Sequence, residues 1–112
     1  METENRLHTR AKVKWPVSIK APTGIIDGTT ENLSLSGAFI RLSKQLNSSA
    51  EIPLVLNAKG RFIPCTARVV WSEERNLSDQ RRFLAIGVRF TRMMLHDREF
   101  LYGEISQHIR QR

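Results

Sequence analysis

Two short groups of residues carry side chains that suit a flat, anionic ligand. Arg6 and Arg10 lie four residues apart, and an Arg guanidinium can grip a phosphate or stack on a ring. Asn32, Ser34 and Gly37 follow later in the chain. The amide and the hydroxyl offer hydrogen bonds, and glycine permits close approach of the backbone. Taken alone, such an Arg pair is usually a solvated surface feature, and Asn-x-Ser-x-x-Gly is usually a turn.

The sequence contains no recognisable catalytic or metal-binding pattern. The three histidines, His8, His96 and His108, share no ligand spacing. No phosphate-binding loop, nucleophile elbow, zinc-protease motif or dinucleotide fingerprint is present. Cys65, the single cysteine, lies within an apolar alternation, which favours a buried small hydrophobe over a nucleophile. We therefore expect a non-enzymatic protein with no catalytic residue, no metal site and no cofactor.

The charge of the chain points to an anionic partner. Eighteen basic residues against 11 acidic ones give a formal net charge of +7, and 13 of the basic residues are Arg. Composition alone leaves nucleic acid, a membrane surface and a small phosphate ligand open. No signal peptide or apolar run long enough to span a membrane is visible, so we expect cytoplasmic localisation without membrane insertion.

Period-two alternation of apolar and polar residues dominates the chain and predicts strands. Turn signals at residues 22–24 and 58–60 separate some of these strands, and we expect polar loops at 43–50 and 72–80. The alternation places Trp71 on the same face as Cys65. The strands are expected at residues 11–21, 25–33, 38–42, 52–56, 62–71 and 83–90.

These elements must fit into one domain, because 112 residues are enough for a single core. Six short strands with hairpin-like spacing predict an all-β fold, a six-stranded antiparallel β-barrel over residues 11–90. The period then changes, and apolar residues at helical spacing predict a C-terminal α-helix over residues 94–110. The whole of residues 1–112 is expected to form this domain, with residues 1–10 as a flexible N-terminal arm.

The order of the two motifs resembles the PilZ domain family. An R-x-x-x-R motif at Arg6 and Arg10 precedes a strand, and an [DN]-x-S-x-x-G motif follows at Asn32, Ser34 and Gly37. Further along, residues 67–71 and 87–90 look like the last two strands of that family. The resemblance covers nearly the whole chain, from Arg6 to the terminal helix.

This resemblance implies a split-barrel receptor for the bacterial second messenger cyclic di-GMP. Arg6 and Arg10 would match two arginines on the arm that closes over the ligand, and Asn32, Ser34 and Gly37 would match the second motif on the barrel surface. Ordering of the arm would present a new surface to a downstream protein effector.

Two further residues are weaker candidates for ligand binding. Asn5 stands where many members of the family carry another Arg, which leaves the number of bound ligands open. Trp71 would supply a stacking face near the site, although a Trp at a strand end more often packs in the core or at its rim.

Two alternatives come from other classes of protein. The first is a ligand-independent PilZ-type interaction adaptor, which the presence of all five motif residues argues against. The second is a small basic barrel that binds single-stranded nucleic acid, which an aromatic content of only 7% argues against. The effector, the state as a monomer or ligand-dependent dimer, and the preference for another cyclic dinucleotide stay open.

Overall fold

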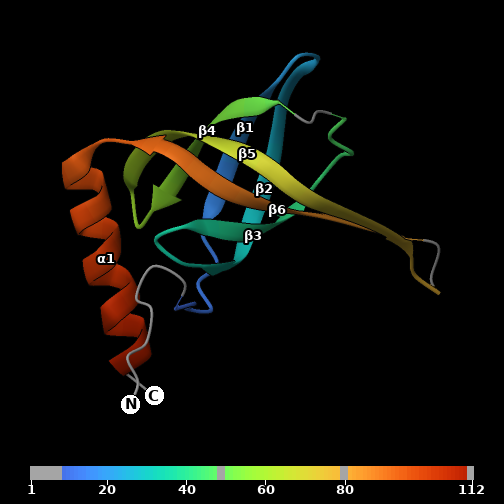
Figure 1. Ribbon diagram of the computed structural model, residues 1–112. Coiled ribbons are helices and arrows are strands. Elements are labelled where there is room, and N and C mark those ends of the chain that lie inside the picture. The colour runs from blue at the N-terminus through green and yellow to red at the C-terminus, as the bar shows by residue number, and fades with distance from the viewer. Residues whose placement is uncertain (1–8, 48–49, 79–80, 111–112) are drawn as a thin grey trace.

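Six strands close into an antiparallel barrel, and one helix follows them (Figure 1). The structure is a computed structural model that describes residues 9–47, 50–78 and 81–110. Around the barrel the strands run in the order β1-β2-β3-β6-β5-β4. The predicted fold class is therefore confirmed. The elements are β1 (Pro16–Ala21), β2 (Gly24–Leu33), β3 (Gly37–Leu42), β4 (Glu51–Ala58), β5 (Arg61–Asn76), β6 (Arg82–Met93) and α1 (Leu95–Arg110).

The barrel consists of two three-stranded meanders. Strands β1, β2 and β3 pair in chain order, and so do β4, β5 and β6. The two meanders meet at two seams, where β3 pairs with β6 and β1 pairs with β4. Within the second meander, Lys59 and Gly60 form a two-residue turn with φ of 58° and 91°, the backbone that a type I′ hairpin requires.

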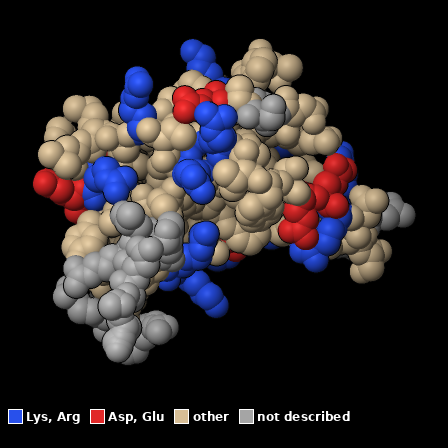
Figure 2. Space-filling model, viewed as in Figure 1, with Lys and Arg blue, Asp and Glu red and all other residues tan. Residues whose placement is uncertain are grey.

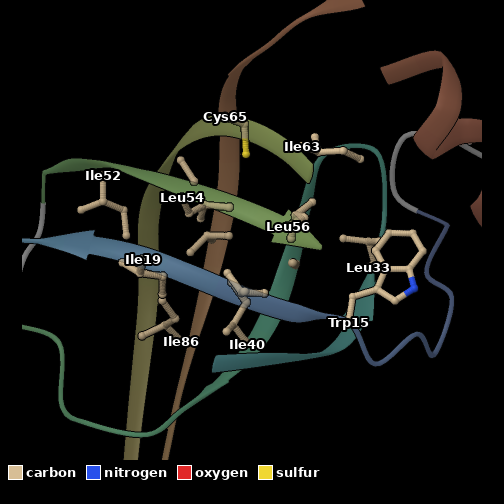
Figure 3. Packing of buried hydrophobic residues seen from close by; sticks show 14 of the residues in the cluster. Trp15, Ile19, Leu33, Ile40, Ile52, Leu54, Leu56, Ile63, Cys65 and Ile86 are labelled. Carbon is tan, nitrogen blue, oxygen red and sulfur yellow. The ribbon is translucent and has the colours of Figure 1, made fainter. Parts of the chain in front are cut away.

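The core fills the interior of the barrel. Side chains from all six strands point inward and pack together, while the alternate residues face outward, as period two requires (Figure 3). The inward set matches the apolar positions of the sequence alternation. It includes Ile19, Leu33, Ile40, Leu54, Leu56, Ile63 and Ile86.

The first predicted strand is only partly regular. Residues 11–15 keep the alternating burial of the sequence pattern, but the strand begins at Pro16. The hydroxyl of buried Thr30 accepts a hydrogen bond from the backbone N–H of Trp15 at 2.8 Å and donates one to the carbonyl of Val13. A side chain therefore replaces part of the backbone ladder, which explains why the alternation continues where regular pairing does not.

The expected loop over residues 72–80 is wrong in its first half. Strand β5 continues to Asn76, and its pairing with β6 runs from Ser72↔Ile86 to Asn76↔Arg82. This part projects from the barrel as a two-stranded ribbon (Figure 1). Because solvent reaches both faces of such a ribbon, charged residues are tolerated on both, and the alternation that marks a half-buried strand disappears. Strand β6 also runs on to Met93, beyond the expected end of the barrel at 90.

Helix α1 lies beside one end of the barrel (Figure 1) and begins one residue later than expected. Leu101 and Ile105 are buried in the same core as the strands. Asp97 is only 6% exposed and pairs with Arg61 of β5 at 2.9 Å. The guanidinium of Arg98 donates to the carbonyl of Leu35 at 3.4 Å. The helix is thus attached both to the β4–β5 hairpin and to the turn that contains the second motif.

Candidate ligand-binding site

The second motif forms the connection between β2 and β3, and Ser34 organises it. The Ser34 side chain is fully buried. Its hydroxyl accepts hydrogen bonds from the backbone N–H groups of Ser36 and Gly37, each at 3.2 Å. The Ser34 N–H donates to the carbonyl of Gly37 at 2.9 Å. Ser34 therefore satisfies the backbone of the turn, as serines in such turns commonly do.

Gly37 lies where β3 meets β6 and leaves no room for a side chain. A Cβ built there would lie 2.0 Å from the carbonyl oxygen of Val88, far closer than non-bonded carbon and oxygen atoms approach each other. The residue is buried at the start of β3 and pairs with Arg89. Its role in the described structure is to allow close approach of two backbones, and it does not line the surface hollow described below.

Arg10 and Asn32 bring the two motifs together. A bridge between Ala11 and Leu33 holds the N-terminal segment against β2. Arg10 is exposed, and its Nη1 donates to Oδ1 of Asn32 at 2.7 Å. One described residue of each motif therefore meets a residue of the other. Arg6 and Asn5 lie outside the described residues.

A row of outward-facing residues crosses four strands beside this pair. The Cα partners run from Asn32 on β2 to Phe39 on β3, then to Gly87 on β6 and Trp71 on β5. The Phe39 and Trp71 rings meet edge to face, with centroids 5.1 Å apart and planes at 65°, an arrangement that aromatic pairs prefer. The row spans the seam between the two meanders.

The Trp71 indole lies directly over Gly87. A Cβ at Gly87 would lie 2.1 Å from Nε1 of that indole, so only glycine permits this placement. Trp71 is 42% exposed, which contradicts the expectation that it shares a face with buried Cys65. The pairing of β5 with β6 shifts by one residue between Val69 and Trp71. Such a bulge turns the following side chain to the other face.

These residues surround a shallow surface hollow of about 240 Å³. Among the described residues its lining contains no carboxylate, and it combines a guanidinium, an amide and an indole with apolar side chains. Phe39, Val70 and Gly87 are lining residues that the sequence reasoning missed. The inward positions Ala38 and Ile40 imply an outward Phe39, so period two alone would have found that residue. The residues that line the hollow are Arg10, Asn32, Ala38, Phe39, Val70, Trp71, Gly87 and Val88.

Cys65 lies in the core, away from this hollow. Burial, and then the nearby carboxylate of Asp97, raise the pKa of its thiol from 9.0 to about 12, which opposes formation of the reactive thiolate. No group of three or more His, Cys, Asp or Glu side chains that would hold a metal ion occurs among the residues that the structure describes. The hollow itself offers hydrogen-bonding, cationic and aromatic groups.

Comparison with known proteins identifies the family. The family model described as the PilZ domain matches residues 4–106. The chain belongs to the PilZ domain family. PilZ domains are generally non-catalytic receptor domains. No curated protein sequence matches this PilZ domain. Within the described residues, no helix is both long and apolar enough to cross a membrane.

Solved structures share the fold of this PilZ domain. It is similar to the Bacillus subtilis inhibitor of motility MotI/DgrA, with a TM-score of 0.79 and 16% identity over 98% of this chain, and it spans about half (53%) of that protein. It is also similar to the PilZ domain of Escherichia coli YcgR with c-di-GMP, with a TM-score of 0.75 and 15% identity over 96% of this chain and 94% of that one. Identities this low establish the fold alone.

Proposed function

We propose that this PilZ domain is a non-enzymatic receptor for cyclic di-GMP, which binds over the hollow. The observation that carries the proposal is the hydrogen bond between Arg10 and Asn32 at the rim of that hollow, because it joins the two motifs at one place. Cyclic di-GMP presents two phosphates and two guanine bases. A surface that offers a guanidinium, an amide and an exposed indole, with no carboxylate from the described part of the chain, matches each of those groups.

Each side chain has a distinct part in the proposed complex. Arg10 binds a phosphate or the O6 and N7 edge of guanine, and its five N–H donors let it keep the bond to Asn32. Asn32 offers both a donor and an acceptor to a base edge. Trp71 supplies the stacking face, backed by Phe39. Ser34 and Gly37 act on the ligand through the shape of the turn between β2 and β3.

The N-terminal arm completes the proposal. Residues 1–10, with Arg6 and with Asn5 as a weaker contact, close over the bound ligand. The arm and the ligand together then form a surface that a downstream protein effector recognises. The YcgR structure, which is described as containing c-di-GMP, supports a ligand of this kind on this fold.

Isothermal titration calorimetry with the folded protein tests the proposal. We expect cyclic di-GMP to bind, and Arg10→Ala to weaken binding roughly ten- to a hundredfold, because each charge-assisted hydrogen bond is worth roughly 1.5–3 kcal/mol. Lys20→Ala is the matched control, since Lys20 is an exposed cation near the end of β1 and does not line the hollow. No heat with cyclic di-GMP at tens of micromolar would rule the proposal out.

A further inference from the structure

A second arginine, Arg89, lies on the outer surface near the hollow that Arg10 lines. Strand pairing runs from Ala11 to Leu33, Ala38 and Val88 across β2, β3 and β6. Arg10 precedes the first residue of this row and Arg89 follows the last. Because all neighbours are antiparallel, both arginines lie at the same level along the strands, on the outer surface. Neighbouring strands are about 4.8 Å apart, so three spacings place the two Cα atoms about 14 Å apart along the barrel surface.

Arg89 also lies directly beside the floor of the hollow. It stands two residues after Gly87 on the same face of β6, and Val88 between them lines the hollow. On β5, Arg68 is its cross-strand partner and is likewise exposed. On β3, its partner is Gly37, which carries no side chain. Arg89 therefore lies next to the hollow that Arg10 lines, without being one of its lining residues.

The pairing of Arg68 with Arg89 is electrostatically unfavourable in the free protein. Like charges directly opposite each other in a sheet repel. Among the described residues, Glu51 lies 3.6 Å from Arg68, and none makes an ion pair or hydrogen bond with the Arg89 side chain. Figure 2 shows Lys and Arg side chains gathered over the middle of this face of the barrel. An anion bound between the two arginines would relieve the repulsion.

We propose that Arg89, supported by Arg68, binds the second phosphodiester of the ligand while Arg10 binds the first. This inference rests on the proposed function and extends the site across β6 and β5. A cyclic dinucleotide carries its two phosphodiesters on opposite sides of one ring. Two guanidinium groups that are separated by three strand spacings beside one hollow suit that arrangement. The aromatic pair Phe39 and Trp71 lines the hollow beside them, where a base is expected.

One neighbouring arginine, Arg92, provides the matched control, and Arg98 does not. Arg92 is exposed on the same strand, but it pairs with Thr66, three residues further from the hollow than Arg89. Arg98 donates to the carbonyl of Leu35 and helps to hold α1 against the turn. Arg92→Ala therefore removes the same charge as Arg89→Ala without removing a proposed phosphate contact, and Arg98 is left unchanged.

Calorimetry with cyclic di-GMP on the full chain tests the inference. We expect Arg89→Ala to raise Kd roughly tenfold or more and Arg92→Ala to change it less than twofold. The Kd of Arg89→Ala should also depend less steeply on NaCl concentration than that of the wild type, because one screened charge pair is lost. Equal effects of the two substitutions, or an unchanged Kd for Arg89→Ala, would overturn the inference.

The same titrations distinguish loss of the second phosphate contact from loss of binding altogether. If the wild type binds no cyclic di-GMP, the proposed function itself fails. If the wild type binds and Arg89→Ala binds equally well, only the second contact fails. Thermal denaturation without ligand should show Arg89→Ala to be at least as stable as the wild type, since a repulsive pair is removed. A labelled single-stranded oligoribonucleotide that binds the wild type and is weakened equally by Arg89→Ala and Arg92→Ala would instead assign this face to nucleic acid.

Discussion

Trp71 shows how a single residue escapes prediction from a period. The alternation of β5 carries Cys65 and Ala67 into the core, and continuing it would bury Trp71 as well. The bulge after Val69 turns the indole outward onto Gly87. The sequence pattern does not mark where the extra residue is accommodated, because that is decided by pairing with β6. Ser34 raises a related difficulty, since one residue type serves both for contact with a ligand and for shaping the turn that holds it.

The burial of Cys65 can be tested without any ligand. Its pKa is raised to about 12 by burial and by Asp97, so the native thiol at pH 8 should react with a disulfide reagent at least tenfold more slowly than the urea-unfolded chain. The thiol of the unfolded chain has a pKa near 9.0 and ionises first. The free energy of unfolding should therefore decrease as pH rises from about 9 to 12, because ionisation of Cys65 stabilises the unfolded chain over that range.

Cys65→Ala is the control for the second measurement. Its free energy of unfolding should fall less steeply with pH over the same range, although its stability near neutral pH is lower because of the cavity. Rapid labelling of the native thiol at pH 8 would show that Cys65 is accessible and would contradict the burial described above.

At the scale of the elements, two glycines allow close approach at the contact between β3 and β6, each to a different neighbour. Gly37 makes room for the backbone of Val88, whereas Gly87 makes room for the side chain of Trp71. The sequence marked Gly37 through its motif, but Gly87 appeared only as part of a strand. Its importance comes from a neighbour on β5 and another on β3, and neither pairing is visible in a single chain without an alignment.

Substitution of the two glycines should have opposite consequences. Gly37→Ala forces a methyl group onto backbone atoms and should cost roughly 1–3 kcal/mol or more of stability, measured by urea unfolding. Gly87→Ala displaces only the indole of Trp71, so stability should change by about 1 kcal/mol or less while cyclic di-GMP affinity falls at least fivefold. A change in tryptophan fluorescence should accompany the second substitution. Unchanged affinity in Gly87→Ala would show that the position of Trp71 does not matter for binding.

At the scale of the whole molecule, the barrel was predictable because six alternating segments and two turn signals agreed with one another. What they left undetermined was which strands close the seams, since pairing between segments far apart in sequence depends on packing of the entire core. The hollow lies across such a seam, with Asn32 and Phe39 from the first meander and Gly87 and Trp71 from the second. The motif residues were therefore easier to find than the residues that face them.

The position of the hollow predicts where a ligand should stabilise the backbone. A ligand that binds only the closed barrel suppresses openings that break the seam. Hydrogen exchange with and without cyclic di-GMP should show the largest gain in protection in the β3–β6 ladder, and a smaller one in the β1–β2 hairpin. Protection that rises most in β1–β2 would contradict binding across the β3–β6 seam.

The β3–β6 seam also determines when, during synthesis of the chain, the proposed site can form. During synthesis the first meander can form as soon as Leu42 has emerged, but the outer edge of β3 then has no partner until β6, more than forty residues later, has been made. Its unpaired backbone groups are open meanwhile to pairing with another nascent chain. Because the proposed site spans this seam, a chain that still lacks β6 has no complete site. A ligand that binds across the seam would then stabilise only chains in which β3 and β6 have already paired.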